Sequence, residues 1–278
     1  MNIGVIGLGL IGGSMAKAIK THTEHTVFGF DKDPSVVLRA KLVEAIDDDL
    51  KDLKDCDMLI LALYPHHTIE FLKERGSEIP AGTLVIDCCG VKEKVCAVGN
   101  ELAKEIGFTY IGGHPMAGIE RSGFAFSTGK LFEGASMILT PSTDIDIESL
   151  TAAKQFFLSL GFGSIKIATP KEHDQMIAYT SQLAHVLSSA YVRTPKALNH
   201  EGFSAGSFRD MIRVATLNEE MWTELFFQNR ENLIEDIDGL IARLTEYSQA
   251  LKEENRETLT AILKDGCRQK ALLEQHER

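Results

Sequence analysis

The sequence predicts an α/β protein in which a doubly wound parallel sheet is followed by an all-α C-terminal domain. Three observations lead to this prediction. The chain opens with a short apolar run that leads into a glycine-rich turn. Further apolar runs alternate with helical patterns as far as residue 168, and everything after about residue 204 has helical periodicity. Strands that alternate with helices form parallel pairs through right-handed crossovers.

The first apolar run, residues 3–6, is typical of a strand that is covered on both faces. Gly7, Gly9 and Gly12 follow it at the G-x-G-x-x-G spacing of a Rossmann-type turn. In such a turn the first glycine permits the tight bend, the second lets the backbone approach a pyrophosphate, and the third lets the helix pack closely on the strand. The residues predicted to bind a dinucleotide here are Gly7, Gly9, Leu10, Ile11 and Gly12.

An acidic residue follows the second predicted strand, residues 26–30. Asp31 lies close to the distance from the glycines at which a carboxylate accepts hydrogen bonds from the adenosine ribose hydroxyls. A carboxylate at this place also repels the 2′-phosphate of NADP. No arginine follows directly, although Lys32 does. The sequence therefore predicts NAD as the cofactor, bound in part by Asp31.

The alternation of strands and helices continues through the N-terminal part of the chain. The later predicted strands are residues 58–63, 83–87, 109–112, 135–140 and 164–168, and the predicted helices between strands are 34–43, 68–75, 93–106 and 147–160. Ligands of such sheets bind beyond the carboxyl ends of the strands. Tyr64, residues 87–90 and residues 113–115 should therefore border one crevice, and Tyr64 is a further candidate for the cofactor site.

The character of the chain changes at residue 169. Thr169 and Glu172 form a capping-box pattern around a proline, and they open a predicted helix that runs to Pro195. Four amphipathic helical segments follow. We therefore expect an NAD-binding Rossmann-type domain at residues 1–168 and a helical domain for substrate binding and dimerisation at residues 169–278. The apolar spacing from residue 233 to 251 fits a homodimer interface and an intrachain core equally.

The composition is that of a soluble, acidic enzyme. A net charge of −11 and a pI near 5.3 argue against nucleic acid or an anionic membrane surface as the main partner. Any anionic substrate must then be held by local cations. The five cysteines show neither C-x-x-C spacing nor a histidine–cysteine cluster, so we expect reduced thiols, no metal site and a cytoplasmic protein.

His114 is the leading catalytic candidate. It follows the predicted strand 109–112, on the side of the sheet where the nicotinamide should lie, in a loop rich in glycine. A neutral imidazole can accept a proton from a substrate hydroxyl while hydride leaves the adjoining carbon. A lone histidine in a turn is more often structural, and only its position favours catalysis.

Two helical segments offer candidates for substrate binding. Ser181, Gln182 and His185 share one face of the long helix, and Arg209 and Arg213 lie one turn apart further along the chain. Both sets also fit an ordinary solvated surface. The other histidines have no partner at an informative spacing; they are His22, His25, His66, His67, His173, His200 and His276.

Four motifs together resemble the prephenate dehydrogenase family. They are Gly-Leu-Gly-Leu-Ile-Gly-Gly-Ser at 7–14, His-Pro-Met-Ala-Gly at 114–118, Ser-Gln-Leu-Ala-His at 181–185, and Phe-Arg-Asp-Met-Ile-Arg-Val-Ala at 208–215 with Met-Trp at 221–222. The second and fourth motifs are much more specific than the glycine pattern. The resemblance implies oxidative decarboxylation of prephenate by NAD⁺ to 4-hydroxyphenylpyruvate, on the branch toward tyrosine.

The same resemblance implies roles for individual residues. It makes His114 the hydrogen-bond acceptor for the ring hydroxyl, His185 a substrate-site residue and Arg213 the cation that clamps a substrate carboxylate. The family commonly has a serine where this chain has Gly90, and the hydroxyl of that serine orients the catalytic histidine. It also often has a histidine in place of Gln182. These departures leave open how His114 is oriented and whether the substrate is prephenate or its amino counterpart, arogenate.

Two rival functions remain. A β-hydroxyacid dehydrogenase would place a catalytic lysine with a nearby asparagine early on the long helix, whereas this chain has Lys171 there and no asparagine before Asn199. A non-catalytic NAD-sensing module would lack the substrate-side histidines and arginines, which are present. Both rivals are therefore less favoured than the prephenate or arogenate activity.

Overall fold

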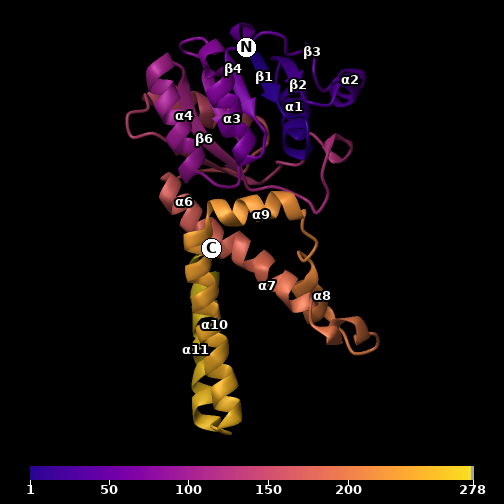
Figure 1. Ribbon diagram of the computed structural model, residues 1–278, viewed down its shortest axis with the longest axis vertical. Coiled ribbons are helices and arrows are strands. Elements are labelled where there is room, and N and C mark those ends of the chain that lie inside the picture. Colours follow the sequence, from indigo (N-terminus) through magenta and orange to yellow (C-terminus); the bar gives the residue numbers. More distant parts are fainter. Residues whose placement is uncertain (277–278) are drawn as a thin grey trace. The chain divides into compact units, whose positions relative to one another are not determined.

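The computed structural model describes residues 1–276 and divides into two compact units, residues 1–230 and the residues from 231 onward. The first unit contains an eight-stranded sheet of order β3-β2-β1-β4-β5-β6-β7-β8 (Figure 1). The strands are β1 (Asn2–Ile6), β2 (Thr26–Phe30), β3 (Asp48–Asp49), β4 (Met58–Leu61), β5 (Leu84–Asp87), β6 (Thr109–Pro115), β7 (Ser136–Pro141) and β8 (Ser164–Ile167). The strand order changes direction at β1, which lies between β2 and β4. A crevice for ligands forms at such a point in doubly wound sheets.

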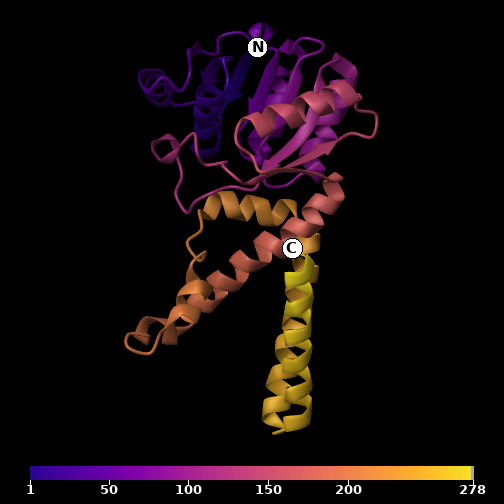
Figure 2. The same cartoon turned by 180° about the vertical axis from the view of Figure 1, so that it is seen from behind.

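Two apolar cores flank the sheet because consecutive strand residues point to opposite faces. On β1, Ile3 and Val5 belong to one core and Ile6 to the other. The helices that connect the strands supply the outer halves of these cores; they are α1 (Leu10–His22), α2 (Pro34–Leu42), α3 (Pro65–Arg75), α4 (Glu93–Ile106) and α5 (Ile147–Ser159). The α3 and α4 side faces the viewer in Figure 1, and Figure 2 shows the opposite side.

One strand pair differs from the predicted all-parallel sheet. β7 runs antiparallel to β6, while the other pairs are parallel. The connection between them, residues 116–135, contains only a short 3-10 turn at Phe124–Phe126, whereas parallel neighbours are usually joined through a crossover α-helix. The antiparallel pairing extends β6 beyond its predicted end at residue 112. His114 therefore lies on a strand, opposite Ile138, and not in a following loop as predicted.

A nearly continuous helical stretch follows β8, as predicted. Its parts are α6 (Pro170–Ile177), the π-helical turn Ala178–Gln182 and α7 (Leu183–Val192), and the unit is completed by α8 (Gly206–Ile212) and α9 (Glu219–Gln228). The predicted capping box is confirmed, because Glu172 N donates to Thr169 Oγ1 while Thr169 N donates to the Glu172 carboxylate. π-Helical turns occur frequently at functional sites, and this one contains Ser181 and Gln182.

The second unit is a helical hairpin. Its helices, α10 (Arg230–Lys252) and α11 (Arg256–His276), are joined by a short turn and lie side by side (Figures 1 and 2). Both helices expose large apolar side chains, namely Ile234, Ile241, Leu244, Leu251, Leu263, Leu272 and Leu273. Across residues 1–276 no helix is both long and apolar enough to cross a membrane. The division at residue 230 separates compact units and does not test the predicted boundary between the NAD-binding domain and the helical domain at residues 168 and 169. That boundary stays a prediction.

Candidate functional site

The glycine-rich turn has the geometry of a phosphate-binding turn. Gly7 has a φ of +89°, and a Cβ there would lie 2.5 Å from a backbone carbonyl oxygen, so only glycine fits. A Cβ on Gly12 would lie 1.8 Å from the carbonyl oxygen of Gly7. At Gly9, by contrast, the Cβ position has no heavy atom within 4 Å, so the backbone is open to a ligand. Leu10 and Ile11 begin α1, whose N–H groups and dipole favour an anion at this end.

Asp31 lies at the end of β2 and holds this turn in place. Its carboxylate accepts hydrogen bonds from the backbone N–H of Leu8 at 2.8 Å and of Asp33 at 3.0 Å. An ionised carboxylate offers about four lone-pair positions. Two positions are therefore left for hydroxyl donors of a ligand bound over the turn.

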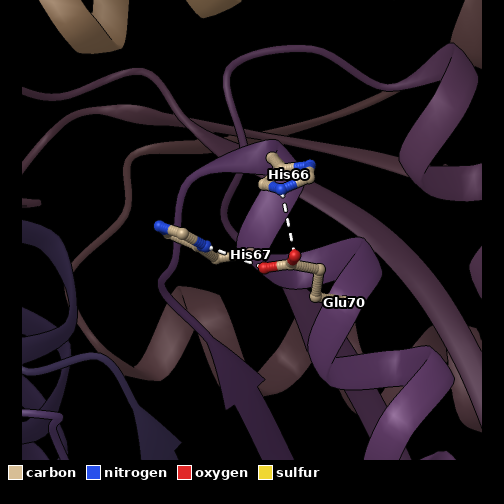
Figure 3. Close-up of side chains that lie close together, drawn as sticks. All are labelled: His66, His67 and Glu70. Atoms are coloured by element: carbon tan, nitrogen blue, oxygen red, sulfur yellow. Dashed lines mark hydrogen bonds and ion pairs between the residues drawn. The ribbon is translucent and has the colours of Figure 1, made fainter.

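Tyr64 follows β4 and is the N-cap of α3. Its exposed ring stacks on His67 with the ring centroids 6.4 Å apart. His66, His67 and Glu70 form a cluster on the first turn of α3. Figure 3 shows both imidazoles directed at the carboxylate, with His66 Nε2 3.0 Å and His67 Nδ1 3.1 Å from its two oxygens. The ligand atoms of these three side chains are close enough to hold a metal ion. All three side chains are exposed and pair with one another, and these pairs account for the cluster without an ion.

His114 makes its polar contact with a second histidine. Nδ1 of His114 on β6 lies 2.8 Å from Nε2 of His173 on α6. Nδ1 of His173 in turn lies 2.7 Å from Oδ1 of Asp174. His173 and Asp174 are each 2% exposed, whereas His114 is half-buried. The prediction that these histidines have no partner at an informative spacing is therefore wrong for three of them. His66 and His67 pair with Glu70, four and three residues later, and His173 pairs with the adjacent Asp174.

A buried ion pair lies beneath the strand end that carries His114. The Lys92 ammonium pairs with the Asp87 carboxylate and also donates to the carbonyl oxygen of Gly113 at 2.6 Å. The hydroxyl of Tyr110 donates to the same carboxylate at 2.5 Å. Lys92 and Asp87 are fully buried, so their charges are stabilised by each other and by these hydrogen bonds. The network fixes the backbone of β6 directly before His114.

The electrostatic surroundings keep both imidazoles neutral near pH 7. The pKa of His114 lies well below its usual value, first because burial penalises the charged form and then because His173 and the Lys92 cation are nearby. Burial also lowers the pKa of His173, although the hydrogen bond to Asp174 opposes this shift. A neutral His114 is the protonation state in which the imidazole can act as a base.

His185 lies on α7 beside an aromatic side chain. Its Nδ1 donates to the carbonyl oxygen of Val214 at 3.0 Å, and its ring lies against that of Trp222 with a centroid separation of 4.0 Å. A carbonyl oxygen can only accept, so the Nδ1 atom carries the proton. Nε2 is therefore the ring nitrogen with which neutral His185 can accept a hydrogen bond from a ligand.

Gln182 uses both ends of its amide within the protein. Its Oε1 accepts from Asn229 at 2.9 Å, its Nε2 donates to the carbonyl oxygen of Leu225 at 3.3 Å, and the side chain is 1% exposed. These bonds join the helix to α9. Ser181 precedes it in the π-helical turn and is half-buried. Direct contact with a substrate is thus geometrically easier for Ser181 than for Gln182.

Arg213 reaches the loop that begins at the end of β6. Its Nη1 lies 3.4 Å from Oε1 of Glu120, and the arginine side chain is 71% exposed. An exposed ion pair of this kind contributes about 0–1 kcal/mol to stability. A carboxylate of a ligand can therefore readily replace Glu120 as the partner of Arg213. Arg209 lies one turn earlier on α8 and is also exposed. The structure thus brings Arg213 to the loop that follows His114.

Sequence reasoning missed three residues around His114, namely Lys92, His173 and Asp174, and it placed Asp87 only at the border of the crevice. Asp87 ends a strand that borders the predicted crevice, and a buried acid in that position was one available signal. The adjacent His173 and Asp174 near the start of the long helix were another. Neither signal specifies a contact with His114, because that contact joins residues 59 positions apart.

Two family models together match most of the chain. Residues 15–166 match the family model of the prephenate dehydrogenase nucleotide-binding domain, and residues 169–265 match that of the prephenate dehydrogenase dimerization domain. The chain is 28% identical over 283 residues to the prephenate dehydrogenase of Lactococcus lactis, with 98% of this chain and 77% of that protein covered.

Two solved structures are similar over nearly the whole chain. The prephenate dehydrogenase from A. aeolicus, crystallised with hydroxyphenyl propionate and NAD⁺, has 26% identity and a TM-score of 0.86, with 98% of each chain covered. The Synechocystis arogenate dehydrogenase has 26% identity and a TM-score of 0.81, with 98% of this chain and 100% of that chain covered. The predicted fold class, a Rossmann-type sheet followed by a helical region, is confirmed. Because the nucleotide-binding model alone matches more than half of its residues, the chain is an oxidoreductase that belongs to the prephenate dehydrogenase family.

Proposed function

We propose that this chain catalyses the NAD-dependent oxidative decarboxylation of prephenate to 4-hydroxyphenylpyruvate, CO₂ and NADH, a step of tyrosine biosynthesis. The observation that carries the proposal is the position of His114, an imidazole near the carboxyl end of β6 whose burial lowers its pKa and so favours the neutral form. Its Nδ1 is occupied by His173 at 2.8 Å, which leaves Nε2 to accept a proton. In this reaction the ring hydroxyl loses its proton as hydride leaves the same carbon, so a positioned base is the group that the chemistry needs.

The cofactor site consists of the glycine-rich turn, Asp31 and Tyr64. The open backbone at Gly9 and the start of α1 suit a pyrophosphate, and the unused lone pairs of Asp31 suit the ribose hydroxyls. Bound NAD⁺ supplies the hydride acceptor. The NAD⁺ in the A. aeolicus relative supports this assignment, and the carboxylate of Asp31 disfavours the 2′-phosphate of NADP.

The substrate site includes Arg213, His185, Ser181 and Arg209. Prephenate carries two carboxylates, and the guanidinium of Arg213 can bind one of them through two parallel hydrogen bonds in place of Glu120. His185 presents its Nε2 beside Trp222, where a substrate group can donate to it. Gln182 contributes indirectly, because its buried amide holds α9 against the helix that carries His185. When the ring carboxylate leaves as CO₂, the product becomes aromatic.

Arogenate is the second candidate substrate. The similarity to an arogenate dehydrogenase supports it, and so does the carboxylate of Glu120 beside Arg213. The amino group of arogenate adds a cation to the side chain, and Glu120 is a ready partner for that cation. The two substrates differ only at this group, so the side-chain end of the site decides between them.

The proposal includes a homodimer in the cytoplasm. The exposed apolar residues of α10 and α11 and the match to a dimerization domain support self-association. The five cysteines are unpaired, which fits a reducing compartment. Light scattering on the purified chain should give the mass of two chains of 30.6 kDa each.

Initial rates of NADH formation with prephenate, arogenate and a panel of small β-hydroxy acids test the proposed function. The highest kcat/KM is expected for prephenate, with CO₂ and 4-hydroxyphenylpyruvate formed in equal amounts to NADH. A higher kcat/KM with arogenate would assign the second candidate. Oxidation of β-hydroxy acids alone, or of none of these compounds, would refute the proposal.

A further inference from the structure

The contact between His114 and His173 joins β6 to α6. The proposed reaction gives a role to His114 and none to His173. We propose that His173, held by Asp174, is the positioning residue that fixes both the orientation and the tautomer of His114. This proposal rests on the proposed function, because it concerns how His114 is prepared to act as the base. His173 itself has no contact with the reacting atoms in this account.

The carboxylate of Asp174 determines which nitrogen atoms of His173 and His114 carry protons. An ionised Asp174 can only accept, so Nδ1 of His173 carries a proton and donates to Oδ1 at 2.7 Å. A neutral His173 then has a lone pair on Nε2. That atom, 2.8 Å away, can only accept from Nδ1–H of His114. The remaining nitrogen of His114, Nε2, is therefore an acceptor, which is the form that can take a proton from a substrate hydroxyl.

Both ends of this arrangement are rigidly held. Asp174 accepts backbone N–H bonds from Lys92 at 2.7 Å and Glu93 at 2.9 Å, at the N-terminus of α4, and that position also stabilises its negative charge. On the other side, Lys92 donates to the carbonyl oxygen of Gly113, immediately before His114. Lys92 thus links the start of α4 to the strand end that carries the base. The His114 ring cannot tilt away without breaking the bond to His173.

The position of Gly90 explains why this chain needs such a partner. A Cβ at residue 90 would lie 3.9 Å from Nε2 of His114 and 3.4 Å from a methyl group of Leu225. Glycine has no polar side-chain atom, so residue 90 offers the imidazole of His114 no side-chain hydrogen bond. The His173–Asp174 pair holds the ring from the opposite nitrogen, and the Nε2 side stays open to substrate.

A matched pair of substitutions separates positioning from simple structural support. In His173→Gln, the amide can place an acceptor near the position of Nε2, so the contact with His114 is kept. In His173→Asn, the shorter amide can replace Nδ1 and keep the contact with Asp174, but it cannot reach His114. We expect His173→Asn to lower kcat by about 10- to 100-fold, the range seen when a residue that orients a metal-binding histidine is lost, with KM for prephenate and NAD⁺ affinity unchanged. His173→Gln should recover most of that loss.

A second readout does not depend on turnover. In protein labelled with ¹⁵N-histidine, long-range proton–nitrogen spectra distinguish the two neutral tautomers, and His114→Asn assigns the signal. His114 is expected as the Nδ1–H tautomer in the wild type and in His173→Gln, and as a mixture of tautomers in His173→Asn. A single unchanged tautomer together with an unchanged kcat in His173→Asn would overturn the proposal, and so would equal losses of kcat in both variants. If the wild type oxidises prephenate, either of these results overturns only the positioning role of His173 and leaves the proposed function intact. A wild type without this activity would instead refute the proposed function.

Discussion

Nδ1 of His114 lies 2.8 Å from Nε2 of His173, and the carboxylate of Asp174 occupies the other side of that second imidazole. A histidine is an unusual choice to orient a base, because it adds a second group that could become charged. Burial removes this difficulty here, since it lowers the pKa of both imidazoles and keeps the pair neutral. The contact therefore orients the base without adding charge.

The first prediction concerns pH. His114 must be neutral to act, and its pKa lies well below the usual 6.5 because of burial, His173 and Lys92. The other charged groups nearby, Asp87 and Asp174, are each paired within the network. Protonation removes the base, so kcat/KM should fall only as the pH drops through this lowered pKa. A pH profile whose acid limb begins above pH 6.5 would contradict the prediction.

The second prediction concerns the cofactor. Asp31 accepts from Leu8 N and offers further lone pairs beyond the end of β2. Asp31→Ala should raise KM for NAD⁺ and narrow the preference for NAD⁺ over NADP⁺ by at least tenfold, which is about 1.4 kcal/mol. Asp33→Ala is the control, since Asp33 caps α2 on the same segment. Equal kcat/KM for the two cofactors in the wild type would show that Asp31 does not select NAD.

The third prediction concerns the substrate carboxylate. Arg213 is exposed in the free protein, and we expect bound prephenate to shield the guanidinium–carboxylate pair from water. Removing one partner of such a desolvated pair costs about 2–5 kcal/mol in binding. Arg213→Ala should therefore raise KM for prephenate by at least thirtyfold and change kcat much less. Arg213→Lys should restore little, because an ammonium cannot form the two parallel bonds. Arg209→Ala is the matched control one turn away, and a larger effect there would mean that Arg209 is the clamp.

The fourth prediction concerns stability. Asp174→Ala leaves the buried N–H of Lys92 and the partly buried N–H of Glu93 without an acceptor, which should cost about 2–4 kcal/mol in the free energy of unfolding. Asp146→Ala removes an exposed cap of α5 and should cost only about 1 kcal/mol. Urea denaturation of the two variants makes the comparison. Equal losses would show that Asp174 is an ordinary helix cap.

Local patterns predicted most of the fold. The apolar runs located the strands, and the Thr169 capping box located the start of the long helix, because each depends on residues that are close in sequence. The antiparallel β6–β7 pair was missed because strand direction depends on the length and form of the connection, and the loop at 116–135 carries no signal of direction. Because β6 and β7 pair as far as Pro115, His114 lies on β6 itself.

The candidate site was only partly predictable. The glycines are recognisable because each must fit a local backbone constraint, such as the positive φ of Gly7. The partners of His114 were not, because tertiary packing brings α6 and α4 to β6. Gln182 shows why a helix pattern alone does not identify a substrate contact. Its helix face predicted such a contact, but its amide is buried and bonds to Asn229 and Leu225.

The kinetics of His114→Asn test most directly the central claim that His114 takes the proton of the ring hydroxyl. The asparagine side chain is close in size but is not a base near neutral pH. Single-turnover oxidation of prephenate should slow by about two to four orders of magnitude, the usual contribution of a positioned base, while NAD⁺ affinity measured by fluorescence stays at the wild-type value. A single-turnover rate in His114→Asn within a few-fold of the wild type would contradict the account.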